Sequence, residues 1–298
     1  MPEPKPDQVL IRVESAGIGI WDAGIREGLI AKMFGIQPTF PWILGSEGAG
    51  KIVAVGDKVS DFRNGDLVYG HEFATNPMEG FQAEYKAQNA SHAWPIPSTL
   101  TTEQVGPLLI DGGTALRGLD DTLGLKRDEK LMIFGASGGL GHFAVQLGKR
   151  LGARVFAVAS GEDGVALALK LGADAAVDGH GENVVASARE FAPKGFDAAL
   201  ITVAGEAPEK ALTTMREGGR VAYPWVNQRP PPKAPSTVRL QGYNGNIDPA
   251  LILKLNKLVD AGKFEVHLGK TFTLDQAVDG YNALGSHYLG RLAIFPNV

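Results

Sequence analysis

The sequence predicts an α/β protein in which a doubly wound parallel sheet accompanies a second, β-rich domain. Three observations lead to this prediction. Short strand-like runs separated by glycine fill the first third of the 298 residues, strands and helices alternate from Leu131 onward, and a glycine-rich elbow joins the first of these strands to its helix. Alternation of this kind requires a parallel sheet with helices on both faces.

The first third is expected to form the β-rich domain. The segments Val9–Gly17, Gly48–Val59 and Gly65–Gly70 carry valine and isoleucine in strand-length pieces, with Gly-Asp turns between them. Between Thr102 and Leu125 the apolar residues change to helical spacing.

From Leu131 onward, each predicted strand is followed by a helix or a turn. We expect strands at Leu131–Phe134, Arg154–Ala159, Ala175–Val177, Ala198–Thr202, Arg220–Tyr223 and Val238–Gly242. We expect helices at Leu140–Leu151, Gly164–Leu171, Asn183–Phe191 and Glu209–Met215. The tail then predicts a helix at Leu251–Ala261, an amphipathic segment at Leu274–Leu284 and a final strand at Gly290–Phe295.

The elbow has the pattern G-x-x-G-x-x-G between a strand and a helix. Glycines there let the chain turn sharply, let the backbone approach a pyrophosphate and let the helix pack close to the sheet, with the helix N-terminus facing the phosphates. A purely structural turn is the alternative, but the strand before the elbow and the helix after it favour a dinucleotide site. The residues predicted to bind the cofactor are Gly135, Ala136, Ser137, Gly138, Gly139, Leu140 and Gly141.

Ser160 ends the second strand of the alternating region and bears on the choice of cofactor. An acidic residue there would accept hydrogen bonds from the ribose 2′-hydroxyl of NAD and would repel a 2′-phosphate. Serine carries no charge and can donate to a phosphate, so Ser160 favours NADP(H). Glu162 and Asp163 have the wrong sign for a phosphate clamp, and NAD(H) is the alternative if one of them turns to the ribose.

Composition excludes several other classes of protein. The net charge of −4 gives no reason to expect nucleic acid or an anionic membrane as a partner. No run of about 18 apolar residues predicts a transmembrane helix, and the first residues lack the layout of a signal peptide. The chain has no cysteine, which excludes disulfides, thiolate nucleophiles and cysteine-ligated zinc. A cytoplasmic location is expected.

Several segments in the same order resemble the medium-chain dehydrogenase/reductase superfamily, in its zinc-free, quinone-oxidoreductase-like branch. GSEGAGKIVAVGDKVSDFRNGDLVYG is similar to the family's catalytic-domain signature, GASGGLGHFAVQLGKRLGARV to its cofactor-binding signature, and the tail to its return into the catalytic domain. The resemblance implies a Rossmann domain inserted into a GroES-like β-rich catalytic domain. We therefore expect residues 1–113 and 249–298 to form the catalytic domain and residues 114–248 the Rossmann domain.

The resemblance also implies that this chain holds no zinc. Zinc-dependent relatives have a Cys-His-Ser-Asp stretch where this chain has GIWD, so Gly19 stands at the ligand cysteine. Their Gly-His-Glu corresponds to GSE, which places Ser46 at the ligand histidine, and their third ligand falls near Ile110. These residues offer neither thiolate nor imidazole for a tetrahedral zinc site.

The catalytic candidates also come from the resemblance. Asp22 and Arg26 match the family pattern N-x-x-D-x-x-x-R-x-G, whose asparagine is replaced by Gly19, which leaves the substrate class open. They are predicted catalytic residues, and a structural ion pair is the alternative. Tyr223 follows the fifth strand and is a candidate proton donor, with simple packing as the alternative.

Further cofactor contacts are implied in the same way. Thr114 matches a family threonine near the nicotinamide, and Val203, Ala204 and Gly205 correspond to the segment that approaches the nicotinamide ribose. Two side chains that commonly support the 2′-phosphate are replaced here by Gly164 and Gly179.

Together these residues predict a zinc-independent, NADPH-dependent oxidoreductase that transfers hydride to a quinone or an α,β-unsaturated carbonyl. Such conjugated acceptors need no Lewis acid, so the protein contributes positioning and exclusion of water. The alternatives are an enoyl or 2-alkenal reductase, or a catalytically weak NADP(H)-binding protein. The resemblance also implies a homodimer, with the strand at Thr237–Tyr243 available for pairing at the sheet edge.

Overall fold

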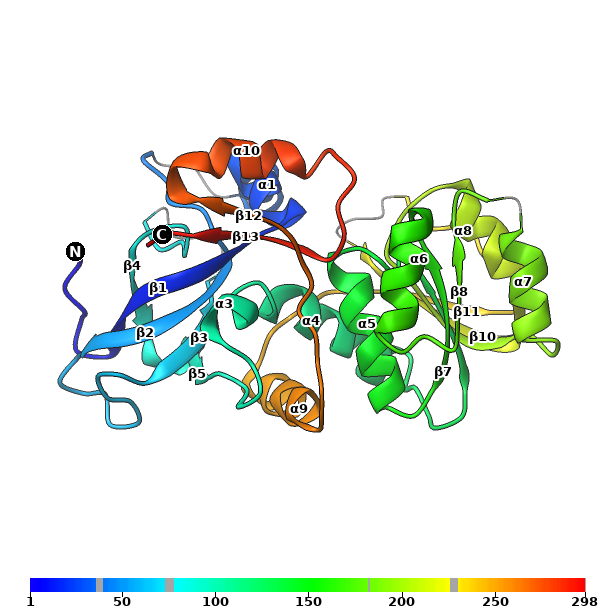
Figure 1. Ribbon diagram of the computed structural model, residues 1–298, viewed down its shortest axis with the longest axis horizontal. Helices are drawn as coiled ribbons and strands as arrows, with labels where there is room; N and C mark the ends of the chain where they lie inside the picture. The colour runs from blue at the N-terminus through cyan, green and yellow to red at the C-terminus, as the bar shows by residue number, and fades with distance from the viewer. Residues whose placement is uncertain (36–39, 73–77, 182, 226–229, 298) are drawn as a thin grey trace. The chain divides into compact units, whose positions relative to one another are not determined.

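The computed structural model describes residues 1–35, 40–72, 78–181, 183–225 and 230–297. The chain divides into two compact units, Met1–Ile110 with Val259–Val298, and Asp111–Leu258 (Figure 1). The structure divides the chain after Ile110 and after Leu258, whereas the sequence analysis expects the boundaries after residues 113 and 248. Within the described ranges, no helix has the combination of length and apolar character that crossing a bilayer requires.

A seven-stranded sheet forms the framework of the first unit, in the order β12-β13-β1-β2-β3-β5, with β4 paired to β1 off this path. Its strands are β1 (Gln8–Ile18), β2 (Glu47–Val55), β3 (Leu67–His71), β4 (Tyr85–Asn89), β5 (Ala93–Pro95), β12 (Leu268–Thr273) and β13 (Arg291–Phe295). β1 pairs antiparallel with β2, with β4 and with β13, where Ala16 lies opposite Ile294. The two ends of the chain therefore build one sheet, as expected for a GroES-like domain.

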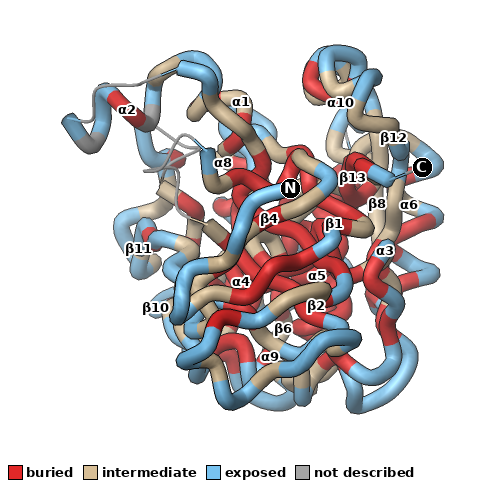
Figure 2. Tube along the Cα trace, turned by 90° about the vertical axis from the view of Figure 1, so that its left-hand side faces the viewer, coloured by how far each residue is buried: buried red, intermediate tan, exposed pale blue. Residues whose placement is uncertain are grey.

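The sequence of β1 explains its central place in this sheet. Val9, Ile11 and Val13 point to one side and pack with Phe81 in a buried core, as the two-residue period of a strand requires. Leu10, on the opposite side, is buried as well, whereas Arg12 on that side is exposed. The tube of β1 is accordingly buried along much of its length (Figure 2).

The helices of the first unit are short. They are α1 (Ile20–Arg26), α2 (Leu29–Phe34), α3 (Thr102–Val105) and α10 (Ala277–Ala283), with single 3₁₀ turns η1 (Ala90–His92) and η5 (Leu274–Gln276). The helical segment expected over Thr102–Leu125 is divided into α3, α4 (Leu109–Leu116) and a π-helical turn η2 (Arg117–Thr122). Pro107 has no N–H to donate, so a helix that begins at Thr102 cannot continue through it.

A stack of three aromatic rings lies at the end of β3. The His71 ring is 5.7 Å from the rings of both His92 and Trp94 and nearly parallel to them. His71 is only 5% exposed. This burial, together with the charge of His92, lowers the pKa of His71 from its ordinary value of 6.5 to about 4.

The buried imidazole predicts a loss of stability in mild acid. Between pH 6.5 and about pH 4 the unfolded chain binds a proton on His71 that the folded chain does not, so the unfolding free energy falls as the pH falls. Above pH 6.5 this contribution is complete, and across the window it amounts to about 3 kcal/mol. Urea unfolding at pH 7 and pH 4 measures it. His71→Phe keeps a ring in the stack and should reduce the difference between the two pH values; an unchanged difference would contradict the assignment.

The second unit contains a six-stranded sheet in the order β11-β10-β9-β6-β7-β8, and all of its strand pairs are parallel. The strands are β6 (Lys130–Phe134), β7 (Arg154–Ala159), β8 (Ala175–Asp178), β9 (Phe196–Ile201), β10 (Met215–Pro224) and β11 (Arg239–Tyr243). Chain order reverses between β6 and β9, which is the doubly wound arrangement. The predicted fold class is confirmed.

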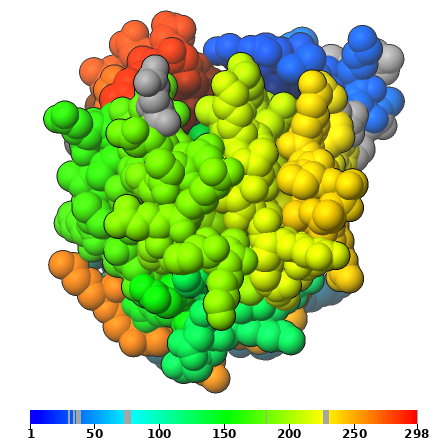
Figure 3. All heavy atoms as spheres, turned by 90° about the vertical axis from the view of Figure 1, so that its right-hand side faces the viewer, coloured from blue at the N-terminus to red at the C-terminus, as the bar shows by residue number. Residues whose placement is uncertain are grey.

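Helices cover both faces of this sheet. α5 (Gly139–Arg150) and α6 (Gly161–Lys170) lie on one face, and α7 (Val184–Phe191) and α8 (Glu206–Ala211) lie on the other (Figure 1). The latter pair forms part of the outer surface coloured yellow-green in Figure 3. α8 begins earlier than expected because Pro208 falls in its first turn, where the missing N–H has no cost.

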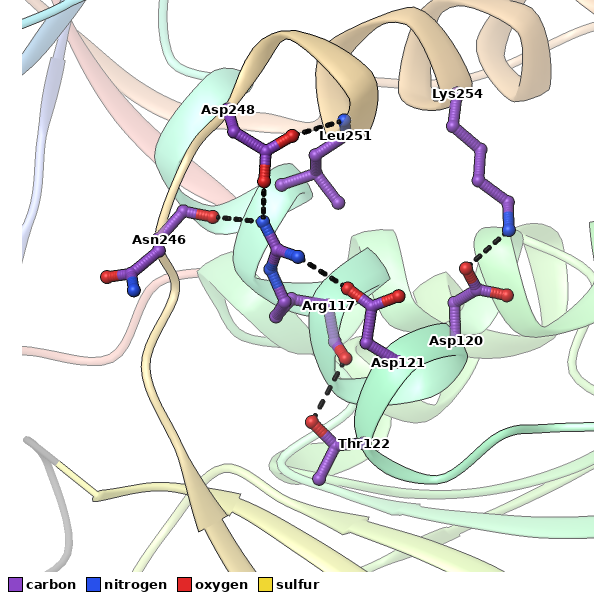
Figure 4. A network of polar contacts seen from close by, with 8 residues as sticks. All are labelled: Arg117, Asp120, Asp121, Thr122, Asn246, Asp248, Leu251 and Lys254. Carbon is purple, nitrogen blue, oxygen red and sulfur yellow. Dashed lines mark hydrogen bonds and ion pairs between the residues drawn. The ribbon is translucent and has the colours of Figure 1, made fainter.

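A polar network joins η2 to the segment that leads into α9 (Pro249–Asp260) (Figure 4). The Arg117 guanidinium contacts carboxylate oxygens of Asp121 and Asp248, each at 2.6 Å, and donates to the carbonyl of Asn246 at 2.7 Å. Asp248 also accepts from the N–H of Leu251 at the start of α9. The network therefore fixes the residues that follow β11 against η2.

Candidate functional site

The elbow after β6 has the geometry that a dinucleotide requires. Gly135 has a φ of 88°, and the backbone N–H groups of Gly135 and Ala136 both donate to the Val158 carbonyl at 2.9 Å. A Cβ on Gly141 would lie 1.9 Å from the Gly135 carbonyl oxygen, so only glycine permits this approach of α5 to the elbow. The seven predicted elbow residues thus lie together between β6 and α5, whose N-terminus can receive a pyrophosphate.

Ser160 is tied to this elbow through Ser137. The Ser160 N–H donates to Ser137 Oγ at 3.1 Å, and Ser160 is the N-cap residue of α6. A Cβ on Gly164 would lie 2.9 Å from both Cβ and Oγ of Ser137. The first turn of α6 therefore packs closely on the elbow, and a larger side chain at residue 164 would require Ser137 to move.

The segment after β9 also reaches the elbow. A Cβ on Gly135 would lie 2.2 Å from Thr202 Oγ1 and 3.1 Å from Val203 Cγ1. Val203 therefore lies beside the elbow, and the predicted contacts of Val203, Ala204 and Gly205 with the nicotinamide ribose stay a prediction. Thr202 was not among the predicted residues, although its position at the end of a central parallel strand could have indicated it. Its hydroxyl donates to the Phe134 carbonyl at 2.9 Å.

Thr114 and Tyr223 lie beside β11 and the residues after it. A Cβ on Gly245 would lie 2.0 Å from Thr114 Oγ1, so the chain after β11 passes close to this buried hydroxyl. The Tyr223 ring lies over Gly242, whose Cβ would be 2.9 Å from its hydroxyl oxygen. Tyr223 also packs against the apolar core of the sheet, which accords with the packing interpretation. Its role as a proton donor stays a prediction.

In the first unit, Asp22 forms the centre of a buried polar cluster. Its Oδ1 accepts from the N–H of Ser46 at 2.8 Å and from the Ser46 hydroxyl at 2.7 Å, and its Oδ2 accepts from the N–H of Gly19 at 3.0 Å. Burial raises the pKa of Asp22, and these hydrogen bonds and the charge of Arg291 act in the opposite direction.

Glu47 and Arg291 form a second buried cluster beside the first. Arg291 Nη2 lies 2.5 Å from Glu47 Oε1, and the side chains are 7% and 2% exposed. Glu47 Oε2 accepts from the N–H of Ile110 at 2.7 Å, and Arg291 Nε donates to the Pro107 carbonyl at 2.9 Å. Sequence reasoning missed this pair; an acidic residue within an apolar strand and an arginine at the start of the last strand were the available signals.

Three residues of this chain stand where zinc-dependent relatives have their zinc ligands. All three donate hydrogen bonds to carboxylates of the chain itself. Gly19 and Ser46 donate to Asp22, and Ile110 donates to Glu47. Gly19 and Ile110 contribute only backbone groups, and the Ser46 hydroxyl is engaged, so this donor set does not fit zinc. In the part of the chain that the structure describes, no three His, Cys, Asp or Glu side chains form a potential metal-binding group.

Arg26 has partners different from those of Asp22. Its guanidinium lies 3.3 Å from Glu27 Oε1 and 5.0 Å from the centre of the Tyr281 ring. The Tyr281 hydroxyl in turn donates to Gln82 Oε1 at 2.9 Å. The contacts of Asp22 and Arg26 therefore do not describe an ion pair between the two, and their predicted catalytic roles are not tested by this geometry.

Comparison with known proteins agrees with both units. Residues 5–98 match the family model described as "Alcohol dehydrogenase GroES-like domain", and residues 139–230 match "Zinc-binding dehydrogenase". A 2-methylene-furan-3-one reductase of Solanum lycopersicum is 30% identical over 304 residues, which cover 99% of this chain and 74% of that protein. The chain belongs to the medium-chain dehydrogenase/reductase superfamily, in its quinone-oxidoreductase-like branch. The predicted resemblance is confirmed.

Other members of the superfamily are similar over different lengths. The quinone oxidoreductase of Homo sapiens is 31% identical over 222 residues, or 74% of this chain, and this chain spans 65% of its length. The solved structure of Escherichia coli quinone oxidoreductase complexed with NADPH has a TM-score of 0.82 and 22% identity, covering 99% of this chain and 94% of that one. At 22% identity, the similarity to the Escherichia coli structure shows a shared fold and no more.

Proposed function

We propose that this chain is an NADP(H)-dependent oxidoreductase that transfers hydride to a quinone or an α,β-unsaturated carbonyl. The observation that carries the proposal is the geometry of the elbow. Residue 141 must be glycine for α5 to approach the Gly135 carbonyl. The Ser160 N–H is hydrogen-bonded to the elbow residue Ser137. The relatives named quinone oxidoreductase and 2-methylene-furan-3-one reductase support the class of acceptor. The solved complex of the same fold with NADPH supports the cofactor.

The residues of the chain supply binding and positioning. The elbow residues Gly135–Gly141 would hold the pyrophosphate, and Val203–Gly205 and Thr114 would contact the nicotinamide half. When bound, the reduced nicotinamide supplies a hydride from C4. Conjugated acceptors suit this chain because Gly19, Ser46 and Ile110 do not provide the ligands with which zinc would stabilise an alkoxide.

The test of cofactor choice is a comparison of NADPH and NADH binding in the wild type and in Ser160→Asp. We expect NADPH to bind more tightly to the wild type, and the added carboxylate to reverse the order because it accepts from a ribose 2′-hydroxyl and repels a 2′-phosphate. The ratio of the two affinities should change by about tenfold or more. Fluorescence titration of the nucleotide measures both dissociation constants.

Ser60→Asp is the matched control, because it adds the same charge at an exposed loop residue of the first unit. It should leave the ratio of affinities unchanged. A preference for NADPH that survives Ser160→Asp would show that Ser160 does not read the 2′-phosphate.

Oxidation of NADPH with a panel of quinones and enones tests the reaction itself. Turnover with quinones or with 2-alkenals separates the main proposal from the alternative of an enoyl or 2-alkenal reductase. Tight nucleotide binding without turnover on any acceptor would favour a catalytically weak NADP(H)-binding protein.

We further propose a homodimer, since β11 is an edge strand of its sheet, and sedimentation of the full chain tests this.

A further inference from the structure

The carboxylate of Asp178 lies next to the residue that is proposed to read the cofactor ribose. Asp178 is the last residue of β8, and in the parallel register it is the partner of Ala159, the residue before Ser160. Its Oδ1 accepts from the N–H of Gly161, the residue after Ser160, at 3.1 Å. Asp178 thus flanks Ser160 although it is 18 residues further along the chain.

The immediate surroundings of this carboxylate keep it ionised. Oδ1 also accepts from the His180 N–H at 3.1 Å, and His180 Nδ1 lies at 2.9 Å. Hydrogen bonds from the backbone of His180 and of Gly161 hold the pKa of Asp178 below its ordinary value. Asp178 therefore carries its negative charge at neutral pH.

The side chains near Asp178 contribute more negative charge than positive charge. Glu162 and Asp163 occupy the first turn of α6. The imidazole of His180 is the basic group in contact with Asp178. Beside Ser160, where the ribose is proposed to lie, the protein thus presents a carboxylate.

We propose that Asp178 is a specificity-determining residue that weakens the binding of NADPH relative to NADH. The proposal rests on the proposed function, since it assumes that the ribose lies beside Ser160. A 2′-phosphate carries negative charge and a 2′-hydroxyl carries none, so a fixed carboxylate within a few ångströms penalises only NADPH. Ser160 then permits the phosphate while Asp178 limits its affinity.

Asp178→Asn tests this with little change of shape, because the amide oxygen can still accept from Gly161. Dissociation constants for NADPH and NADH are measured at pH 8 by fluorescence titration of the whole chain. We expect NADPH to bind about five- to twentyfold more tightly to the variant, and NADH to change less than about twofold. Glu217→Gln is the matched control. It also removes one carboxylate charge, but near the start of β10, whereas Asp178 lies at the end of β8. The affinities for NADPH and NADH should both remain those of the wild type.

A purely structural role for Asp178 would move both affinities together, and an unchanged ratio in a folded Asp178→Asn would overturn the inference while the proposed function stands. Failure of the wild type to bind either nucleotide would overturn the proposed function and this inference with it.

The salt dependence of nucleotide binding to the wild type supplies a measurement that does not depend on the variant. If the carboxylate repels the phosphate, the ratio of NADPH to NADH affinity rises as salt increases from about 0.02 to 0.3 M, because screening weakens the repulsion; a falling or constant ratio contradicts it.

Discussion

Replacement of Gly138 by alanine is expected to weaken the binding of NADPH and NADH about tenfold or more while leaving the fold intact. A Cβ at this residue would lie 3.6 Å from the Gly135 carbonyl oxygen, which is an ordinary contact, and the backbone has an extended conformation with a φ of −82°. The protein alone therefore accommodates the methyl group. A pyrophosphate that approaches the elbow would meet it, because close approach of the backbone is the function of a glycine there. Titration of both nucleotides and urea unfolding of the unliganded chain give the two results.

Gly141→Ala provides the contrasting variant. Its Cβ would lie 1.9 Å from the Gly135 carbonyl oxygen, so α5 must shift even without a ligand. We expect this variant to lose about 1–3 kcal/mol of unfolding free energy, whereas Gly138→Ala should change it by less than about 1 kcal/mol. If Gly138→Ala binds both nucleotides as the wild type does, the elbow is a structural turn and the cofactor assignment is wrong.

Arg291→Met is expected to destabilise the first unit by about 3–5 kcal/mol, because it leaves the Glu47 carboxylate buried without its counter-charge. Glu47 is 2% exposed, and Arg291 also donates to the Pro107 carbonyl, so both the ion pair and a backbone contact are lost. Urea unfolding of the whole chain at pH 7 measures the effect. The nucleotide affinity of the folded fraction should not change, since these residues belong to the first unit.

Two further variants separate burial of the charge from loss of packing. Arg63→Met breaks an ion pair whose arginine is 90% exposed and should change the unfolding free energy by less than about 1 kcal/mol. Glu47→Gln combined with Arg291→Met removes both charges and should recover part of the stability that Arg291→Met alone loses. An Arg291→Met protein as stable as the wild type would mean that Glu47 is protonated or solvated in the folded chain.

The alternating region was predictable because its signals are local. Apolar runs such as Leu131–Phe134 have the length of a buried parallel strand, and glycine marks the beginning of α5, so β6, α5 and β7 fall within a residue of their predicted bounds. The elbow was predictable for the same reason. Its conformational requirement, a positive φ at Gly135 and a close approach at Gly141, is met by glycine alone and is therefore visible in the sequence.

Features that depend on distant parts of the chain were not predictable in this way. β12 is an edge strand with three exposed residues, and its pattern does not differ from that of a loop. Glu47 and Arg291 are 244 residues apart, and only the pairing of the two chain ends brings their charges together. Asp178 likewise approaches Ser160 only through the register of β7 and β8.

The pairing of β1 with β13 also sets an order of events during synthesis. Domains generally fold as units while the chain emerges from the ribosome. Residues 111–258 form a continuous unit, so the parallel sheet has all of its strands available before residues 259–298 are made. The sheet of the first unit is completed later, because the second half of β1 pairs with β2 but lacks its other neighbour until Arg291–Phe295 have left the ribosome. The unit whose synthesis begins first is therefore the unit that is completed last.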